Sequence, residues 1–485
     1  LVGSEMCIRD RHTATAGAFN TLAMGINKTE TAVLWKTGKM WFRVPETVKI
    51  VLKNRLPEGV FAKDLALWIK GILSKLDVNG LAIEYHGEGV ASLSIDDRMT
   101  IANISTEMGV VSSAFPPDDR LADYFNEPAV RGVWADEEAV YSRFIEIDLA
   151  NVFPMVYDTG NNVLQGVEEL VGLKIQQGLI GACASGRLED LRLVSMILEG
   201  KHIANGFQLF VVPASRDIYL RAVEEGIIDK IAQSGAMVLG SSCGPCLGVG
   251  RVASVGNSRF ISTANSQYIG GTNHSGVEKY IASPATVAMT ALRGELTPMI
   301  HFEGTQYKYN IPQVEPVVLG EYDYRKSNGV WNYGDIDNIS SNQIFSEKLT
   351  CRLTLEQVEE IKPYLFKGLD PNFTCDVKPG DIIIAGENFG CGQLVKHAAT
   401  GLVAVGVKLV IAKSVNRDFY RMAINHGLRI LVDWAVVDAY TSGEQLTIDD
   451  ENHLLYLNER AYKLPYVDAE FQKILEKGGL VNAFS

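Results

Sequence analysis

The fold of this chain is indicated most clearly by residues 207–246, which read FQLFVVPASRDIYLRAVEEGIIDKIAQSGAMVLGSSCGPC. An apolar strand pattern at 207–213 is followed by a helical pattern at 215–225 and by a second strand pattern at 236–240. This alternation predicts parallel strands in a sheet that helices cover on both faces. Because ligands of such sheets collect in the loops after the strands, the two cysteines at the end of the stretch lie where a ligand site is expected.

The same alternation continues over most of the chain and predicts an α/β fold. Of the 485 residues, 47% are hydrophobic and 21% are charged, a globular composition long enough for three or more domains. From 294 to 325 the pattern lapses into prolines, tyrosines and scattered charge, which is typical of an interdomain linker. Further strands are expected beyond it, at 381–385, 409–412 and 428–432. We therefore expect several α/β/α domains in residues 12–293, a linker at 294–325, and another α/β domain in residues 326–485.

Composition and charge exclude several classes of function. The formal net charge of −13 argues against a broad nucleic-acid-binding surface, because neutralising phosphates takes clustered lysine and arginine. No apolar run approaches the roughly 18 residues of a membrane-spanning helix, which argues against a membrane role. Seven cysteines are too few for a disulfide scaffold in so long a chain. Since thiolate ligands need reducing conditions, we expect a cytoplasmic protein.

Three cysteines carry the chemical signal: Cys183 in Gly-Ala-Cys-Ala-Ser-Gly-Arg, then Cys243 and Cys246 in Cys-Gly-Pro-Cys. Three such thiolates hold three irons of a [4Fe–4S] cluster and leave the fourth iron without a protein ligand. One alternative is a buried, unligated Cys183, and another is a thiol–disulfide exchange pair at Cys243 and Cys246. An exchange pair opens a helix, which Gly248 and Gly250 each disfavour by roughly 1 kcal/mol.

The surrounding segments resemble those of the aconitase superfamily, and within it the isopropylmalate isomerase and homoaconitase branch. They follow the family's order over nearly the whole chain. The matching segments are HTATAGA at 12–18, TGKMWFRVPE at 37–46, CASGRLEDLR at 183–192, CGPCLG at 243–248, STAN at 262–265, GENFGCG at 386–392 and NHGL at 425–428. The resemblance implies a hydro-lyase or isomerase of a small hydroxy carboxylic acid, with a [4Fe–4S] cluster on Cys183, Cys243 and Cys246 and a C-terminal swivel domain.

The resemblance also assigns polar residues to the site. His12 matches the histidine of the family's Asp-Ser-His motif, and Asn103 and Glu107 match its Asn-X-X-X-Glu segment. All three are expected to be catalytic, on the acid side of a dehydration. Asn103 and Glu107 are four residues apart and would share one helical face, for which a solvated surface pair is the alternative. Asn265 matches an asparagine close to the cluster and is expected in the substrate-binding set.

The sequence departs from its relatives in the swivel loop, which normally reads Gly-Ser-Ser-Arg-Glu-His. Here residues 392–397 read GQLVKH. In relatives the serine acts as base and the arginine binds a substrate carboxylate, whereas Gln393 cannot act as a general base and Val395 cannot bind a carboxylate. We expect Gln393 and Lys396 at the substrate, and Lys396, His397 or a residue further upstream as the base.

Arginines that bind carboxylates in relatives are missing elsewhere. Residues 266–271 read SQYIGG where relatives have two arginines, and Lys348 replaces a third. Lysine does not reproduce the planar, two-point contact of arginine with a carboxylate. Arg417 and Arg421 keep family positions and are expected to bind substrate, with helix-end surface arginines as the alternative. We therefore expect either a substrate with fewer carboxylates or a non-catalytic, cluster-binding or sensor protein.

The first eleven residues, LVGSEMCIRDR, have no initiating methionine, no apolar signal core and no relation to the family pattern, which starts at His12. They look like a translated sequencing adapter, so residues 1–11 are expected to be an artefact. In relatives the Asp-Ser-His-Thr motif lies far into the chain. The resemblance thus implies an enzyme that is incomplete at its N-terminus.

Overall fold

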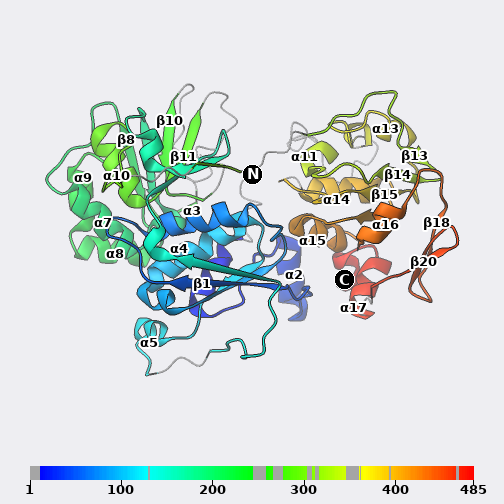
Figure 1. Cartoon of the computed structure of the whole chain (residues 1–485), viewed down its shortest axis with the longest axis horizontal. Coiled ribbons are helices and arrows are strands. Elements are labelled where there is room, and N and C mark those ends of the chain that lie inside the picture. The colour runs from blue at the N-terminus through cyan, green and yellow to red at the C-terminus, as the bar shows by residue number, and fades with distance from the viewer. Residues whose placement is uncertain are drawn as a thin grey trace. The chain divides into compact units, whose positions relative to one another are not determined.

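The computed structural model describes residues 11–128, 132–243, 258–265, 277–302, 308–311, 316–345, 360, 362–392, 395–465 and 469–484. The chain divides into two compact units. Unit 1 contains Ile26–Arg43 and Val314–Ser485, and unit 2 contains Arg9–Gly25 and Val44–Gln313. Each unit has its own sheets and helices, which confirms the expected α/β class (Figure 1).

Unit 2 contains a four-stranded parallel sheet in the order β3-β2-β1-β4. Its strands are β1 Thr47–Lys53, β2 Ala82–His86, β3 Ser112–Ala114 and β4 Arg143–Asp148. Alternate residues of β1, such as Val48 and Ile50, are buried in one core with Leu65 and Ile69 of helix α3 (Ala62–Leu73) and with helix α4 (Ile95–Ser105). Burying each such aliphatic side chain stabilises the fold by about 1.5–3 kcal/mol.

A second sheet of unit 2 has eight strands in the order β12-β6-β5-β11-β10-β7-β8-β9. Neighbouring strands from β11 to β9 are parallel, and β5, β6 and β12 extend the sheet in antiparallel pairs. The strands are β5 Met155–Asp158, β6 Val163–Gly166, β7 Gln177–Gly181, β8 Gln208–Val212, β9 Met237–Val238, β10 Arg259–Ser262, β11 Glu278–Ala282 and β12 Lys308–Asn310. The strand, helix and strand predicted within residues 207–246 are confirmed as β8, α8 (Arg216–Glu224) and β9.

Both faces of this second sheet are buried. Ile180 and Val211 lie in a core with helices α7 (Leu188–Leu198), α9 (Ile227–Gln233) and α10 (Pro284–Arg293). Figure 1 shows these helices gathered beside β8, β10 and β11. Leu179 and Phe210 point to the other face, into the core that contains α3. The parallel strands are therefore covered on both sides, as their continuous apolar sequence predicts.

Shorter helices complete unit 2 and lie mostly at the ends of strands. They are η1 Arg11–Phe19, η2 Glu88–Ser92, η3 Thr106–Met108, α5 Asp119–Phe125, η4 Leu149–Asn151, η5 Val167–Leu170 and α6 Ala182–Ser185. Within the segment expected as a linker, β12 pairs with β6 of unit 2, and the boundary to unit 1 follows Gln313.

Unit 1 is built on a five-stranded sheet in the order β13-β14-β15-β16-β17, parallel except for the β13–β14 pair. Its strands are β13 Lys326–Ser327, β14 Val330–Tyr333, β15 Ile382–Ala385, β16 Leu409–Ala412 and β17 Arg429–Val432, and a separate antiparallel sheet has β18 Leu446–Asp449, β19 Leu454–Leu457 and β20 Arg460–Lys463. Its helices are α2 Lys28–Thr37, α11 Ser341–Ile344, η8 Lys362–Tyr364, α13 Phe373–Asp376, α14 Val395–Ala404, α15 Arg417–Asn425, α16 Trp434–Ala439, α17 Ala469–Glu476 and α18 Leu480–Phe484. The strands predicted at 381–385, 409–412 and 428–432 are confirmed.

The segment Ile26–Arg43 leaves the N-terminal part of the chain to pack within unit 1, a feature that the sequence pattern does not predict. Its anchor is Glu30, whose side chain is fully buried and accepts hydrogen bonds from Arg421 Nε (2.5 Å) and Asn425 Nδ2 (2.6 Å). Trp41 Nε1 donates to Asn425 Oδ1 at 3.0 Å, and the Arg421 guanidinium lies 4.9 Å from the Trp41 ring centroid. These contacts give Arg421 a structural role.

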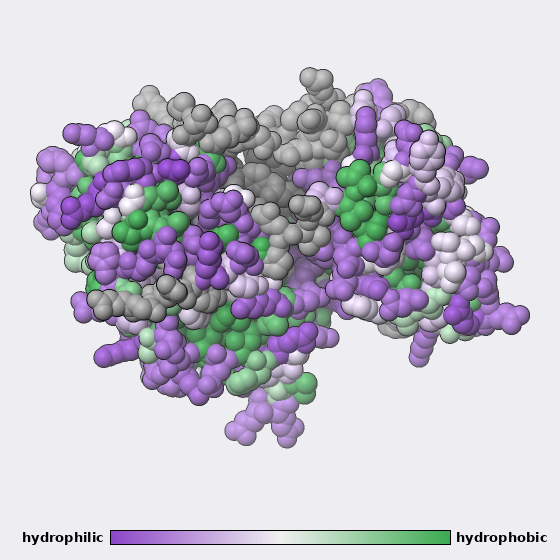
Figure 2. All heavy atoms as spheres, turned by 45° about the horizontal axis from the view of Figure 1, so that its top comes forward, coloured by the Kyte–Doolittle hydropathy of each residue, from purple (hydrophilic) through white to green (hydrophobic). Residues whose placement is uncertain are grey.

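The surface carries polar side chains, and the apolar ones gather mainly in the cores. Figure 2 shows hydrophilic side chains over most of the face in view, with smaller apolar patches between them. In the described part of the chain, no helix is both long enough and apolar enough to cross a membrane.

Arg421→Ala is expected to loosen the packing of α2 on α15, because it leaves the buried Glu30 carboxylate without its cation. Removing one partner of a buried pair costs about 3–5 kcal/mol. Hydrogen exchange of the full chain at α2 and α15 measures the effect within unit 1. The control is Arg429→Ala in β17 of the same unit, whose partner Asp450 is 59% exposed and whose loss is expected to change stability by less than about 0.5 kcal/mol. Equal protection in the two variants would contradict the assigned role.

Candidate active site

The candidate site lies at one edge of the second sheet of unit 2. Strands β9, β8, β7 and β10 are neighbours and parallel, so their carboxyl ends meet at the same edge. The loops after three of these strands carry predicted site residues: Cys183 follows β7, Cys243 follows β9 and Asn265 follows β10. Ligand sites of parallel sheets form at this edge.

A tight turn after β7 presents Cys183. Gly181 ends the strand at φ +118°, where a Cβ atom would lie 2.0 Å from the carbonyl oxygen of Val212 on the neighbouring strand. Only glycine fits such a position. The next residue, Ala182, has φ +55°, which is rare for a residue with a side chain. Arg187, 3% exposed, then donates from Nη2 to the carbonyl oxygen of Cys183 at 2.9 Å and so braces the turn.

His12 contacts two of the predicted residues. Its Nε2 lies 3.2 Å from Glu107 Oε1, and its Nδ1 lies 3.5 Å from Cys183 Sγ. The His12 and Glu107 side chains are 15% and 13% exposed. Burial lowers the pKa of His12, but hydrogen bonds and charge interactions with Cys183 and Glu107 outweigh it and raise the pKa to about 10. At neutral pH the His12 ring is therefore protonated, and it lies between the Cys183 sulfur and the Glu107 carboxyl group.

Asn103 and Asn265 form a chain of amide hydrogen bonds beside this cluster. Asn265 Nδ2 donates to Asn103 Oδ1, and Asn103 Nδ2 donates to Thr15 Oγ1 at 2.8 Å and to the Cys183 carbonyl oxygen at 3.4 Å. Both asparagines are buried. Asn103 lies on α4, whereas Glu107 lies in the following turn η3, because the α-helix ends at Ser105. The two residues therefore reach the site from different elements, although their spacing suggests one helical face.

Lys63 and Lys70 belong to this neighbourhood and were not expected from the sequence. Lys63, 1% exposed, donates from Nζ to Asn265 Oδ1, and Lys70 Nζ lies 3.4 Å from the Glu107 carbonyl oxygen. Burial lowers the pKa of Lys63 to about 7, although the charges of Glu107 and Cys183 act in the opposite direction. Both lysines lie on α3, seven residues apart. A spacing of seven residues is two helical turns, and it is the one sequence signal that places the two lysines on a common face.

The other predicted site residues belong to unit 1 or lie outside the described residues. Lys396 and His397 are in the first turn of α14, where the His397 ring stacks on Phe345 with centroids 5.5 Å apart. Arg417 donates to its neighbour Asp418 from Nε and Nη2, and Arg421 is part of the Glu30 network. Gln393 and Cys246 lie outside the described residues, as do Lys348 and residues 266–271.

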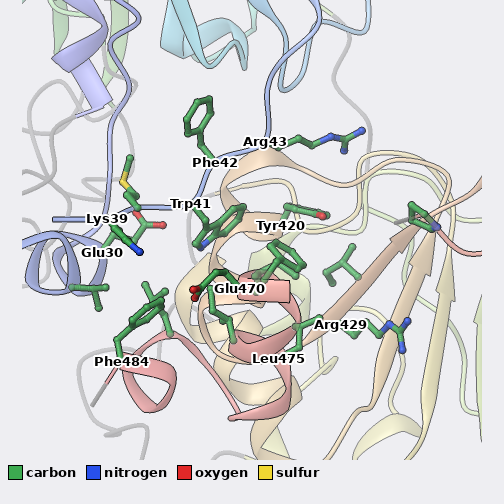
Figure 3. A pocket seen from close by; sticks show the side chains of 18 of the residues that line it. Glu30, Lys39, Trp41, Phe42, Arg43, Tyr420, Arg429, Glu470, Leu475 and Phe484 are labelled. Carbon is green, nitrogen blue, oxygen red and sulfur yellow. The ribbon is translucent and has the colours of Figure 1, made fainter. Parts of the chain in front are cut away.

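A hollow of about 830 Å³ lies in unit 1, between Ile26–Arg43 and the C-terminal elements. Figure 3 shows Trp41 and Phe42 from the first segment and Tyr420, Leu475 and Phe484 from the second around it. None of the predicted site residues lines this hollow. Its size and apolar walls are typical of ligand pockets, but the predicted catalytic groups are elsewhere.

Family profiles match most of the chain. The profile of the Aconitase family (aconitate hydratase) matches residues 2–168 and 157–294, and that of the Aconitase C-terminal domain matches residues 331–432. The first profile covers most of unit 2 and also Ile26–Arg43 of unit 1, and the second lies in unit 1, in the order that the sequence motifs predict. The resemblance inferred from those motifs is confirmed.

Three similar proteins are named either as a 3-isopropylmalate dehydratase or as a homoaconitase. The 3-isopropylmalate dehydratase large subunit 1 of Methanopyrus kandleri is 38% identical over 293 residues, which cover 59% of this chain and 70% of the relative. The mitochondrial homoaconitase of Debaryomyces hansenii is 29% identical over 535 residues, covering 97% of this chain and 77% of the relative. A solved 3-isopropylmalate dehydratase from Methanocaldococcus jannaschii is 34% identical, covers 30% of this chain and 86% of its own, and has a TM-score of 0.28. Since the first profile alone spans more than half of the sequence, the chain belongs to the aconitase family.

Proposed function

We propose that this chain is a [4Fe–4S]-dependent hydro-lyase or isomerase that removes water from a small hydroxy carboxylic acid and adds it back. The observation that carries the proposal is the double contact of His12, at 3.5 Å from Cys183 Sγ and 3.2 Å from Glu107 Oε1. These two contacts bring together, in one partly buried site, the sulfur of a proposed cluster ligand, the proposed acid His12 and the carboxylate of Glu107. Family membership, with relatives named as a dehydratase and a homoaconitase, supports the same reaction class.

Cys183, Cys243 and Cys246 would hold the cluster. Iron–sulfur clusters take cysteine thiolates as ligands, and neither Cys183 nor Cys243 is in a disulfide. Among the described residues no three His, Cys, Asp or Glu side chains are grouped to hold a metal, and the third proposed ligand, Cys246, is not among those residues. The two described cysteines fit the group in ligand type and in their place at one sheet edge. When bound, the cluster supplies a Lewis acid for the hydroxyl and a carboxylate of the substrate.

His12 is the proposed acid. Since its pKa is raised to about 10, it carries a proton at neutral pH, and Glu107 orients the ring that holds this proton. Given to the leaving hydroxyl, the proton makes water the leaving group. A base takes the proton from the neighbouring carbon, and the electron pair of that C–H bond forms the double bond. Lys396 and His397 are the proposed bases, since Gln393 cannot accept this proton.

The substrate pocket is proposed to differ from that of aconitase itself. Serine, glycine and valine replace arginines at 266, 271 and 395, and Arg421 binds Glu30 within its own unit. Each arginine that is replaced takes away one two-point binding site for a carboxylate. We therefore propose a substrate with fewer carboxylates than a tricarboxylic acid.

The replaced serine and arginines also favour a second candidate, a cluster-binding sensor without turnover. A screen of small hydroxy acids with the cluster-loaded chain separates the two, because dehydration produces an alkene that absorbs in the ultraviolet. Turnover of any of these acids excludes the sensor. A loaded chain that turns over none of them favours it.

Cys183→Ser is expected to abolish most cluster loading, because it removes one of the three proposed thiolate ligands. Anaerobic reconstitution with iron and sulfide, followed by visible absorption and iron analysis, measures the loss. Cys375→Ser is the matched control, since Cys375 is exposed in unit 1. Unchanged loading in Cys183→Ser would contradict the ligand assignment.

Glu107→Gln is expected to lower turnover by about 10²–10⁴-fold, because His12 loses the carboxylate that stabilises its charge and orients its ring. Cluster absorption should remain unchanged. Turnover is measured with whichever hydroxy acid the screen identifies. Glu169→Gln, at an exposed position of the same unit, should leave turnover unaffected, and an equal effect of the two variants would argue against the role of Glu107.

A further inference from the structure

Lys63 is a buried lysine that forms no ion pair with a carboxylate among the described residues. Its side chain is 1% exposed, and the hydrogen bond from Nζ goes to the neutral Asn265 Oδ1. A buried lysine is usually paired with an acid, because removing an ammonium from water is costly. The fold therefore keeps Lys63 at this position at the expense of stability, which points to a role in the site.

The hydrogen bond of Lys63 determines how the next two side chains are oriented. When protonated, the Lys63 amine only donates, so Asn265 then turns its Oδ1 toward Lys63 and its Nδ2 away. That Nδ2 donates to Asn103 Oδ1, which leaves the Nδ2 of Asn103 to donate to Thr15 Oγ1 and to the Cys183 carbonyl oxygen. Each amide could otherwise flip, since its two ends are similar in shape. The protonated Lys63 at one end of the chain and the Cys183 carbonyl oxygen, which only accepts, at the other thus favour the same order of hydrogen bonds.

We infer that Lys63 is a positioning residue, which sets the amide orientation of Asn265 and Asn103 and through them holds the turn that carries Cys183. Its burial keeps it from contact with a substrate, so it acts through Asn265. Only the catalytic importance of this role rests on the proposed function. The ordering of the turn is a property of the protein alone.

Lys70 offers a matched comparison. It lies on the same helix two turns later and is partly buried near Glu107, but its Nζ contacts the Glu107 carbonyl oxygen at 3.4 Å rather than an asparagine side chain. A general effect of removing a lysine from this face of α3 would appear in both positions. An effect through the amide chain would appear only at Lys63.

Hydrogen exchange of the full chain without cluster, in the segments 100–107 and 181–187, tests the inference. Lys63→Met, which keeps the length and apolar bulk of the side chain, is expected to speed exchange in both segments about tenfold, as expected for losing a hydrogen bond to a charged group. Exchange in α10 of the same unit serves as the internal reference. Lys70→Met should leave the ratio to α10 unchanged.

A double-mutant cycle with Asn265→Ala decides whether Lys63 acts through Asn265. If it does, the double variant matches Asn265→Ala alone, because the effects of residues in one hydrogen-bond chain are not additive. Additive effects, an unchanged ratio in Lys63→Met, or an equal change in Lys70→Met would each overturn the inference.

Lys63→Gln keeps a donor and should restore part of the protection, and it replaces Lys63→Met in the cycle if that variant does not fold. Since neither cluster nor substrate is present, failure here is separate from failure of the proposed reaction.

Discussion

The parallel pairing of β7 with β8 and β10 is the constraint on which the site depends. It brings the carboxyl ends of these strands to one edge, so that Cys183 and Asn265, far apart in sequence, follow neighbouring strands. The approach of β7 to β8 is so close at Gly181 that a side chain there would meet the carbonyl of Val212. The close packing of these two strand backbones therefore requires glycine at position 181, at the start of the turn that carries Cys183.

Charge is concentrated around this turn although the chain as a whole is acidic. His12, Lys63 and Arg187 lie in or beside the site, with Glu107 as the carboxylate that contacts His12. A positive environment favours thiolates, which are the form that binds metals. The cations come from three different elements: η1, α3 and the turn before α7.

In unit 1, one of the two arginines that match family positions stabilises the unit itself. Arg421, expected at the substrate from the motif, binds the buried Glu30 and covers Trp41, and these contacts attach Ile26–Arg43 to α15. A guanidinium committed to a buried carboxylate has little capacity left for a second anion. Arg421 is therefore occupied by contacts within its own unit.

Sequence pattern alone predicts the α/β class, the parallel strands within 207–246, the positions of three strands in the C-terminal unit and the cysteine motifs. These follow from periodicity and residue type, which report burial and ligand chemistry locally. Tertiary structure alone decided that His12 meets Cys183 and Glu107, that Lys63 meets Asn265, and that Ile26–Arg43 packs in unit 1. Such contacts join residues that no local pattern connects, because they depend on strand order and on where each helix ends, as the end of α4 at Ser105 shows for Glu107.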